Sequence, residues 1–309
     1  MRRVLVTGAS GFIGSHCLPA LLARGFEVHA VSRRSQAESG DVVWHQADLL
    51  KASDRERVLA ESMPSDLLHG AWEVTAAGAY RDRRTNHDWL SASAALFESA
   101  IQSGVGRVLA LGTCWEYDVG YGWCREFQTP LRPSLPYSEA KEALGRYILA
   151  AELEGVTTAW GRIFFSFGPG DRTRRLVPSA VQALLAGEPF ECSQGSQIRD
   201  FVYVEDLADA IAALLASAVN GPVNLASGVP RTLRSIVEMI ASELGRTDLV
   251  RFGRVTATGL DAEPMLAGDV RRLTDEVGWR PSTGFEEGIR RTIAWWQNQP
   301  VSSNSRRLA

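Results

Sequence analysis

Two residues near the middle of the chain, Tyr137 and Lys141, have the types and spacing of an acid–base pair. They open a stretch with a helical pattern that runs to about Glu152, and residues at i and i+4 share one face of a helix. An ammonium group there would stabilise a phenolate and lower the tyrosine pKa from about 10 towards the working range. Thr113, next to a predicted strand end, would hold a carbonyl or alcohol oxygen beside Tyr137. Because this spacing is more common as plain helix surface, the interpretation depends on the rest of the chain.

A glycine-rich turn near the N-terminus supplies that context. Residues 3–7 form a β-branched run typical of a strand covered on both faces, and residues 15–24 have a helical pattern. Of the three glycines between them, one allows the tight turn, one lets backbone N–H groups approach a pyrophosphate, and one lets the helix pack close to the strand. We therefore expect a dinucleotide site in place of an ordinary strand–helix turn. Its residues are Gly8, Ser10, Gly11, Phe12, Ile13 and Gly14.

The end of the second predicted strand, residues 27–32, bears on which dinucleotide binds. An acidic residue about 20 positions after the glycine motif usually accepts the ribose 2′-hydroxyl of NAD. This strand ends in Ser32 and Arg33 with no carboxylate. A serine can donate a hydrogen bond to a 2′-phosphate and an arginine can pair with it, whereas two arginines after a strand are also common on ordinary surface. The pattern favours NADP(H) and leaves NAD(H) open.

Alternating strands and helices continue through the first half of the chain. Further strands are expected at 42–46, 66–71 and 107–111, with a strong helical pattern over 89–103. Repeated units of this kind predict an α/β fold with a doubly wound parallel (Rossmann) sheet. Ligands of such folds bind at the carboxyl ends of the strands. There we expect Gly70 and Thr113, with Asp48 and Leu49 near the adenine.

Composition excludes several other classes of protein. The 309 residues carry 33 Lys+Arg against 36 Asp+Glu, so the chain lacks the broad basic field of a nucleic-acid-binding protein. No apolar run approaches the roughly 18 residues of a membrane span, and the N-terminus lacks a signal peptide's apolar segment. Four cysteines without paired spacing fit free thiols in the cytoplasm, and the five histidines show no metal-binding pattern, so no metal is expected.

Taken together, these motifs resemble the extended short-chain dehydrogenase/reductases of the nucleotide-sugar epimerase/dehydratase type. The resemblance runs from Thr7 to about residue 298 and includes TGxxGxxG, the strand end His69-Gly-Ala, YxxxK and the later Arg199-Asp-Phe-Val-Tyr-Val. It implies that Tyr137 is the general acid/base, that Lys141 binds the nicotinamide ribose and tunes Tyr137, and that Thr113 holds the reacting oxygen. It also implies that Ala71 and Phe164 complete the cofactor cleft.

The second half of the chain is expected to bind a nucleotide diphosphate-sugar. Arg199 matches the position that contacts the diphosphate in similar enzymes, because a guanidinium can pair with a phosphate through two hydrogen bonds. The alternative is a structural arginine paired with Asp200 or Asp206. We expect a dinucleotide-binding domain of residues 1–165 plus 201–228, a substrate-binding domain of 166–200 plus 229–298, and a disordered tail over 299–309. The predicted substrate residues are Trp72, Cys114, Trp115, Phe165, Val177 and Arg199.

Departures from the family pattern separate the possible reactions. The 4,6-dehydratases carry an Asp-Glu pair just after the threonine, whereas Cys114 and Trp115 stand here. Cys114 is a candidate proton donor, although a buried structural cysteine is the simpler interpretation. Phe165 replaces an asparagine that usually touches the substrate. Trp72 stands where small residues are usual in the family, and with Trp115 and Trp123 it would either form an apolar wall against a deoxysugar or belong to the core.

Three functions follow in order of preference. The first is an NADP(H)-dependent reductase of the 4-keto group of a nucleotide-linked 6-deoxysugar, and the second is a 4-epimerase that retains NAD. The third, a non-catalytic NADP-binding scaffold, is disfavoured because Tyr137 and Lys141 are both present. The helical stretches 89–103 and 137–152 match the pair that forms the dimer interface in similar enzymes, so a homodimer is expected.

Overall fold

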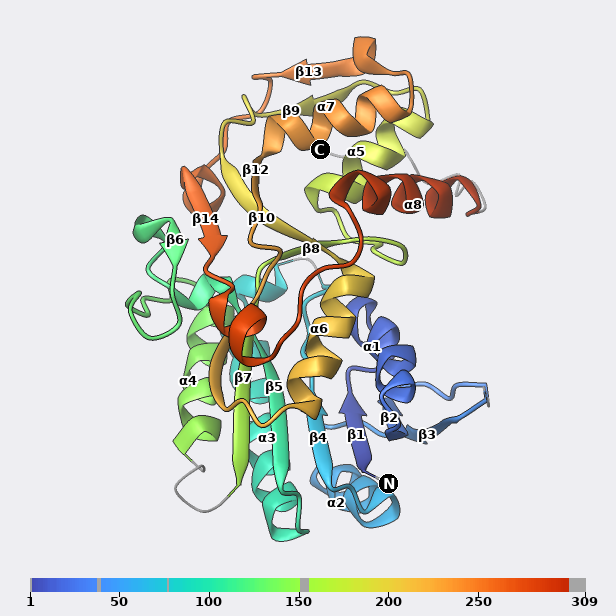
Figure 1. Ribbon diagram of the computed structural model, residues 1–309, viewed down its shortest axis with the longest axis vertical. Helices are drawn as coiled ribbons and strands as arrows, with labels where there is room; N and C mark the ends of the chain where they lie inside the picture. The colour runs from blue at the N-terminus through green and yellow to red at the C-terminus, as the bar shows by residue number, and fades with distance from the viewer. Residues whose placement is uncertain (1, 38–39, 77, 151–155, 300–309) are drawn as a thin grey trace.

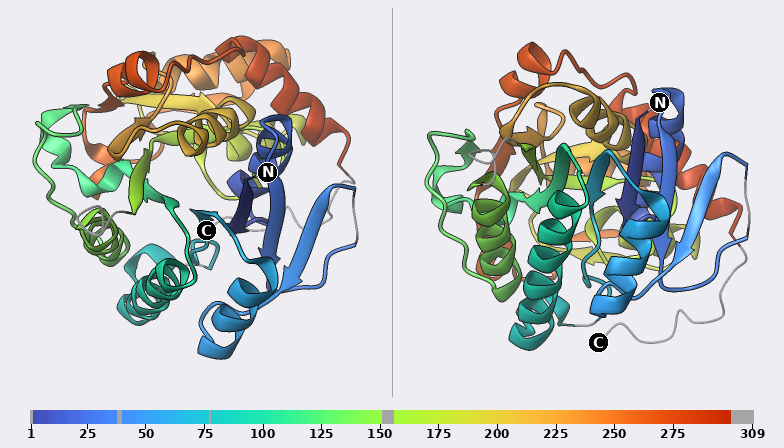
Figure 2. Two further views of the ribbon diagram at one scale, coloured as in Figure 1. Left: turned by 60° about the horizontal axis from the view of Figure 1, so that its bottom comes forward. Right: turned by 90° about the horizontal axis from the view of Figure 1, so that it is seen from below.

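A seven-stranded parallel sheet forms the centre of the computed structural model, which describes residues 2–37, 40–76, 78–150 and 156–299. The strands run in the order β11-β7-β5-β4-β1-β2-β3. Helices cover both faces, which confirms the predicted doubly wound α/β fold (Figures 1 and 2). The strands are β1 (Arg3–Thr7), β2 (Glu27–Ser32), β3 (Val42–Gln46), β4 (Asp66–His69), β5 (Arg107–Thr113), β7 (Thr157–Ile163) and β11 (Gly221–Leu225).

The central strands are apolar in their middle because both of their faces are covered, and their polar residues, such as Arg107 and Thr113 of β5, stand at the strand ends. Val4, Leu5 and Val6 of β1 have no exposed surface, and every residue of β5 is buried. The order of the strands reverses between β1 and β4, since β2 and β3 follow on one side of β1 and β4 and β5 on the other. Open parallel sheets bind their ligands at such a point, beside the carboxyl ends of the strands.

Two layers of helices sandwich this sheet, as Figure 2 shows. One layer packs in a core with the sheet residues Val4, Val6 and Leu109, and the other in a core with Leu5 and Leu67. The first layer consists of α1 (Phe12–Ala23) and α6 (Val204–Ala216), and the second of α2 (Ala52–Ser62), α3 (Arg83–Gln102) and α4 (Pro136–Ala150). The helix expected from residue 15 begins three residues earlier, at Phe12, and the strand expected to reach residue 71 ends at His69.

A second, smaller group of elements lies above the carboxyl ends of the main sheet, at the top of Figure 1. It contains a sheet in the order β12-β10-β14-β6, with β8 beside β10, and the pair β13-β9. Its core includes Phe167, Val177 and Ile240. The elements are β6 (Trp123–Cys124), β8 (Phe165–Phe167), β9 (Phe190–Cys192), β10 (Ile198–Tyr203), β12 (Pro230–Thr232), β13 (Val250–Phe252), β14 (Met265–Gly268), α5 (Leu176–Leu185), α7 (Leu233–Glu243) and α8 (Phe285–Gln297).

The division into two discontinuous domains stays a prediction, and β10 runs across its proposed boundary at residue 201. Residues 300–309 of the expected tail, and the end of the helix expected to reach residue 152, lie outside the described residues. Within the described residues, no helix is both long and apolar enough to cross a membrane.

Candidate active site

The glycine-rich turn between β1 and α1 is a place where only glycine fits. Gly8 has a φ of +72°, and a Cβ on it would lie 2.7 Å from the carbonyl carbon of Gly70. A Cβ on Gly14 would lie 2.1 Å from the oxygen of Gly8. Because α1 begins at Phe12, immediately after this turn, its free N–H groups and positive dipole end face the crevice. The residues present therefore fit the pyrophosphate of a dinucleotide.

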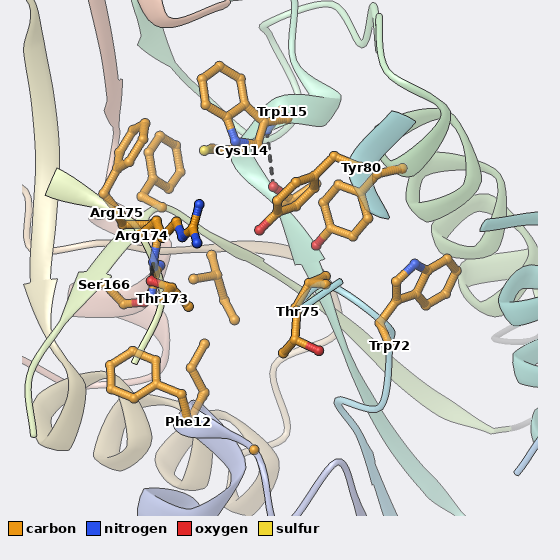
Figure 3. A pocket seen from close by; sticks show the side chains of 18 of the residues that line it. Phe12, Trp72, Thr75, Tyr80, Cys114, Trp115, Ser166, Thr173, Arg174 and Arg175 are labelled. Atoms are coloured by element: carbon orange, nitrogen blue, oxygen red, sulfur yellow. Dashed lines mark hydrogen bonds between the residues drawn. The ribbon is translucent and has the colours of Figure 1, made fainter. Parts of the chain in front are cut away.

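A cavity of about 1330 Å³ extends from this turn to the second sheet. In Figure 3, Phe12 lies at one end of it, Cys114 and Trp115 lie at the other, and Trp72 and Tyr80 face Arg174 and Arg175 across it. All but one of the predicted site residues line this cavity: Gly8, Ser10, Gly11, Phe12, Ile13, Gly14, Ser32, Arg33, Leu49, Gly70, Ala71, Trp72, Thr113, Cys114, Trp115, Tyr137, Lys141, Phe164, Phe165, Val177 and Arg199.

Asp48 is the predicted site residue that does not line the cavity. Its carboxylate accepts a hydrogen bond from the backbone N–H of Leu50, at 3.2 Å, in the turn before α2. This local turn takes up the side chain, which is a common use of aspartate before a helix. The neighbouring Leu49 is buried and does face the cavity.

The rim of the cavity at the end of β2 combines a hydroxyl, a cation and a carboxylate. Ser32 lies 3.4 Å from the hydroxyl of Ser10 and accepts a hydrogen bond from the N–H of Arg34. The guanidinium of Arg33 is largely exposed and lies 3.5 Å from the carboxylate of Glu73, which follows β4. Sequence reasoning missed Glu73 because it comes from a different strand end, more than 40 positions away from the place where an acid was sought.

The predicted acid–base residues lie together on α4 and β5. Tyr137 is in the first turn of α4, and the buried ammonium of Lys141 donates a hydrogen bond to the carbonyl oxygen of Leu111, at 2.9 Å. Thr113 ends β5 and accepts a hydrogen bond from the N–H of Trp115, at 3.3 Å. All three face the cavity, so the fold brings together the residues that the motif predicts.

The protonation of this pair differs from the expectation that Lys141 lowers the pKa of Tyr137. Burial raises the pKa of the Tyr137 phenol well above its usual range, with further contributions from Tyr80, Glu116 and Cys114, and a hydrogen bond with Thr113 opposes them. Burial also lowers the pKa of Lys141 to about 7, against a smaller raising effect of Glu116. Tyr137 is therefore a neutral phenol that carries a proton.

A buried ionic network fixes the end of β5. The carboxylate of Glu116 has no exposed surface and accepts hydrogen bonds from the N–H of Thr113, at 2.8 Å, from the indole of Trp160, at 2.9 Å, and from Arg162, at 2.7 Å. Arg162 also donates to the hydroxyl of Tyr117, at 3.1 Å. Sequence reasoning missed this role of Glu116. The only available signal was its spacing from Thr113, which lets its carboxylate reach back to the threonine N–H.

Aromatic side chains line the end of the cavity beneath the second sheet. Trp115 contacts Phe165 edge to face, with 5.7 Å between ring centroids, and Phe165 lies 5.4 Å from Phe201. Cys114 lies beside them, 2% exposed, and burial raises the pKa of its thiol well above the usual value. The thiol therefore stays protonated. Trp115 and Phe165 line the cavity and form an apolar wall there, whereas the contact of this wall with a deoxysugar stays a prediction.

Arg199 reaches this wall from β10 but has neither of the partners considered for a structural arginine. Its two terminal nitrogens donate to four backbone carbonyls, those of Ile198, Leu260, Asp261 and Glu263, at 2.9–3.3 Å. Its guanidinium lies 5.6 Å from the ring centre of Phe165. Asp200 instead accepts hydrogen bonds from Ser227 and Gly228, and Asp206 from Ser282 and Thr283. Arg199 thus connects the cavity wall to the 260–263 segment.

Two further residues, Tyr80 and Arg175, line the cavity. Tyr80, in a short 3-10 helix over Ala79–Arg81, packs edge to face on Tyr137 with 5.0 Å between ring centroids. Arg175, just before α5, lies 5.4 Å from the ring centre of Phe12 and pairs with Asp171 at 2.8 Å. Neither residue belongs to a motif with fixed spacing. Tyr80 in particular has no signal in the sequence that predicts its place in the cavity. Among the described residues, no cluster of three or more His, Cys, Asp or Glu could hold a metal ion.

A doubly wound parallel sheet with a glycine turn, a tyrosine and lysine on one helix, and a threonine on the adjacent strand defines a dinucleotide-dependent enzyme. The chain belongs to the NAD dependent epimerase/dehydratase family, whose model matches residues 4–226. It is thus an NAD(P)-dependent enzyme of the extended short-chain dehydrogenase/reductase type, which confirms the resemblance drawn from the sequence.

Its relatives carry out several reactions. The chain is 27% identical over 322 residues to a dTDP-6-deoxy-L-talose 4-dehydrogenase (NAD(P)(+)) of Kitasatospora kifunensis, with 97% of each chain covered. It is 26% identical over 338 residues to a dTDP-glucose 4,6-dehydratase of Neisseria gonorrhoeae, covering 96% of this chain and 95% of the relative. A crystal structure of the UDP-glucose 4-epimerase of Thermus thermophilus with NAD superposes with a TM-score of 0.83 at 27% identity, covering 96% of this chain and 100% of the other.

Proposed function

We propose that this protein is an NADP(H)-dependent reductase of the 4-keto group of a nucleotide diphosphate-linked 6-deoxysugar. The observation that carries the proposal is the kind of proton carrier beside Thr113. Tyr137 is a neutral phenol facing the cavity, while Glu116, the nearest carboxylate in sequence, is bound by Arg162, Trp160 and a backbone N–H. Reduction of a ketone needs one proton donor, whereas elimination of water needs a further acid/base pair.

The chain's own residues perform the proton transfer. When bound, the dinucleotide supplies the hydride that is added to the keto carbon. The hydroxyl of Thr113 orients the substrate's carbonyl oxygen, and Tyr137 donates its proton to that oxygen, which leaves an alcohol and a phenolate. The ammonium of Lys141 on the same helix stabilises the phenolate until a proton from solvent restores the phenol.

The glycine turn and the rim of the cavity are proposed to hold the cofactor. The N–H groups of Phe12 and Ile13 would bind its pyrophosphate, since the N–H of Gly11 is bonded to the oxygen of Gly8 at 3.0 Å. Ser32 and Arg33 would bind a 2′-phosphate. The end of β2 itself bears no carboxylate, and Arg33, which is paired with Glu73 across the rim, is exposed and able to turn towards the phosphate. These features support NADP(H) over NAD(H).

The aromatic end of the cavity is proposed to hold the sugar. Trp115 and Phe165 present apolar surface that suits the methyl group and the deoxygenated face of a 6-deoxysugar. Val177 closes this part of the cavity from α5, and Cys114 contributes a protonated thiol. Arg199 would turn from its backbone carbonyls to the substrate's diphosphate. The named activity of the Kitasatospora relative, on a dTDP-linked 6-deoxysugar, supports this class of substrate.

A panel of nucleotide-linked 4-keto-6-deoxyhexoses tests the reaction. The purified protein should consume NADPH with a dTDP- or GDP-linked member of the panel, followed at the nicotinamide absorbance band, and should yield the corresponding alcohol by mass spectrometry. Tyr137→Phe is the matched control, since it keeps the ring and removes the proton. No loss of absorbance with any member of the panel would contradict the proposal.

A 4-epimerase that retains NAD is the second candidate, and two observations favour it. The superposed Thermus structure is a 4-epimerase in complex with NAD. In this chain the carboxylate of Glu73 lies 3.5 Å from Arg33, where it could accept a hydrogen bond from a ribose hydroxyl. The cofactor released from freshly purified protein decides between the two, by its mass and ultraviolet spectrum. Tightly bound NAD, together with interconversion of epimers without net consumption of cofactor, would favour the epimerase.

We further propose that the protein acts as a homodimer in the cytoplasm. Helices α3 and α4 lie side by side on the outer face of the sheet (Figure 2), and the small residues Ala95 of α3 and Ala143 of α4 are partly or fully exposed. Small residues there would let a second copy of the helices approach closely. Light scattering after size-exclusion chromatography should give twice the mass of the chain, and Ala143→Arg should reduce it to the mass of the monomer.

A further inference from the structure

The ammonium of Lys141 is placed in an unusual environment for a charge. The residue is 3% exposed, and its Nζ donates one hydrogen bond, to the carbonyl oxygen of Leu111. The nearest other partner is the ring of Trp72, whose centre lies 4.1 Å from Nζ. Within the described part of the chain, Lys141 forms no ion pair. The face of an indole attracts a cation electrostatically, and more strongly where water is excluded.

The charged and titratable groups around Lys141 do not replace this contact. Glu116, on the turn after β5, acts on Lys141 at longer range, but its carboxylate is already paired with Arg162. His69, at the end of β4, is buried, and its pKa is lowered to about 3 by burial and by Lys141, so it is neutral. Tyr137, on the same helix, is a neutral phenol. The π face of Trp72 is therefore the main compensation for the buried charge besides one carbonyl.

Trp72 is itself held in a fixed orientation. Its indole N–H donates to the amide oxygen of Asn86 at 2.9 Å, and the amide nitrogen of Asn86 donates to the carbonyls of Ala79 and Asp82 at 2.7 and 2.8 Å. Its ring stacks on Trp89, with 6.2 Å between centroids and 29° between planes. Figure 3 shows the side chain on one wall of the cavity. A ring fixed by a hydrogen bond and a stacking partner loses little entropy when it holds a cation.

We propose that Trp72 is a positioning residue for Lys141, and that the face of its indole keeps the ammonium charged and in place against the carbonyl of Leu111. Trp72 lies outside the Tyr-x-x-x-Lys motif, so it supplies a contact that this motif does not contain. The consequence for turnover rests on the proposed function. A charged Lys141 stabilises the phenolate that Tyr137 becomes, so Trp72 acts on the reaction through Lys141. Because Trp72 also lies edge to face against Tyr137, with 6.2 Å between ring centroids, the titration of Lys141 itself separates this effect from the direct contact.

The composition of the chain makes a direct test possible, because Lys51 and Lys141 are its only lysines. Protein labelled with ¹³C at lysine Cε gives two signals in a carbon–proton spectrum, and Lys51→Arg assigns them. Lys51 is exposed at the start of α2 and serves as the reference. The pH titration of the Lys141 signal then reports its charge in the full-length protein, without cofactor or substrate.

The titration is compared between the wild type, Trp72→Phe and Trp72→Leu. Loss of the π face should lower the midpoint of Lys141 by about one pH unit in Trp72→Leu. Trp72→Phe keeps a weaker π face and should lie between the two. An unchanged or raised midpoint in Trp72→Leu would overturn the proposal; should that variant fail to fold, an unchanged or raised midpoint in Trp72→Phe decides equally.

A second measurement connects the contact to the reaction. The pH profile of kcat for oxidation of the alcohol should move its limb to higher pH in Trp72→Leu, because a neutral Lys141 no longer favours the phenolate. A variant damaged only in structure would lower kcat at all pH values without moving this limb. Because the lysine titration needs no substrate, its failure leaves the proposed reaction standing, and an inactive substrate panel leaves the lysine result standing.

Discussion

The two ends of the cavity are built in different ways. At the cofactor end, backbone makes the site: the turn at Gly8 and Gly14 is so close that a Cβ on either would overlap other backbone atoms. At the substrate end, side chains make the site, with Arg199 spread over four carbonyls and Trp115, Phe165 and Phe201 in contact. A backbone site leaves a rigid spacing pattern in the sequence, whereas a side-chain site depends on which distant segments come together.

Tyr137 lies where the two ends meet, and its removal should have the largest effect. Tyr137→Phe keeps the ring, which packs against Tyr80, and removes the proton donor. Turnover of the 4-keto substrate should fall by about 10²–10⁴-fold. Tyr147→Phe, on the same helix with its hydroxyl bonded to Glu98, is the control and should retain turnover. Comparable losses in both variants would mean that the effect comes from the helix and not from the proton.

The stability of the protein at low pH tests the role of His69, which is buried below the cofactor end of the cavity. His69 is buried between Thr7 and Ser93, and burial lowers its pKa to about 3. The unfolded chain binds this proton near pH 6.5, so the free energy of unfolding should decline as the pH falls below about 6.5 and continue to about pH 3, by up to about 5 kcal/mol.

Urea unfolding over this pH range measures the effect. His69→Asn should flatten the decline, whereas His87→Asn, which replaces an exposed histidine, should leave it as it is. An equally steep decline in His69→Asn would show that other groups cause it.

Arg199→Ala tests whether this side chain stabilises the substrate end of the cavity. Four hydrogen bonds to backbone carbonyls are lost, and the free energy of unfolding should fall by about 2–4 kcal/mol. The KM for the nucleotide-sugar should rise as well. Arg251→Ala removes an exposed arginine that also bonds backbone carbonyls, and should cost less than about 0.5 kcal/mol. A rise in KM with unchanged stability would make Arg199 a binding residue alone.

Gly14→Ala applies the corresponding test to the cofactor end. The added Cβ would overlap the oxygen of Gly8, so we expect a loss of about 1–3 kcal/mol of stability and weakened dinucleotide binding. Gly106→Ala meets no atom within 4 Å and is the matched control. Calorimetric titration with NADPH and thermal unfolding check both variants. Wild-type cofactor affinity in Gly14→Ala would contradict a site built from backbone.

The rim at Arg33 should give the smallest effect. Arg33→Ser removes an exposed cation, and the Kd for NADPH should rise by about tenfold while the Kd for NADH changes little. Arg34→Ser, one position further on and not among the residues that line the cavity, should change neither. An equal rise in Kd for NADPH and NADH would show that Arg33 does not bind the 2′-phosphate, and would strengthen the case for NAD.

The sequence predicts the cofactor end more fully than the substrate end, because a site made of backbone leaves a local spacing pattern in the sequence. The glycines, the strand runs and the Tyr137–Lys141 spacing are local patterns, and each appears in the structure, with the ends of some strands and helices displaced by a few residues. The places of Glu73 and Tyr80 in the cavity, and the partners of Arg199, depend on contacts between segments far apart in the chain. The role of Glu116 depends on its carboxylate, which reaches back to the N–H of Thr113. Asp48 was expected near the adenine but is used by the turn before α2. The neutral state of Tyr137 comes from burial, which spacing does not reveal.

The direction of hydride transfer is tested most directly with NADPH that carries deuterium in the transferable position at nicotinamide C4. With a dTDP- or GDP-linked 4-keto-6-deoxyhexose, the reductase account predicts that the product alcohol carries the deuterium at C4, with one cofactor consumed for each product formed. Tyr137→Phe should form almost none of it. No deuterium in the product and no consumption of NADPH with the ketone, together with interconversion of the nucleotide-linked C4 alcohol and its C4 epimer without net use of cofactor, would contradict the account and identify an epimerase.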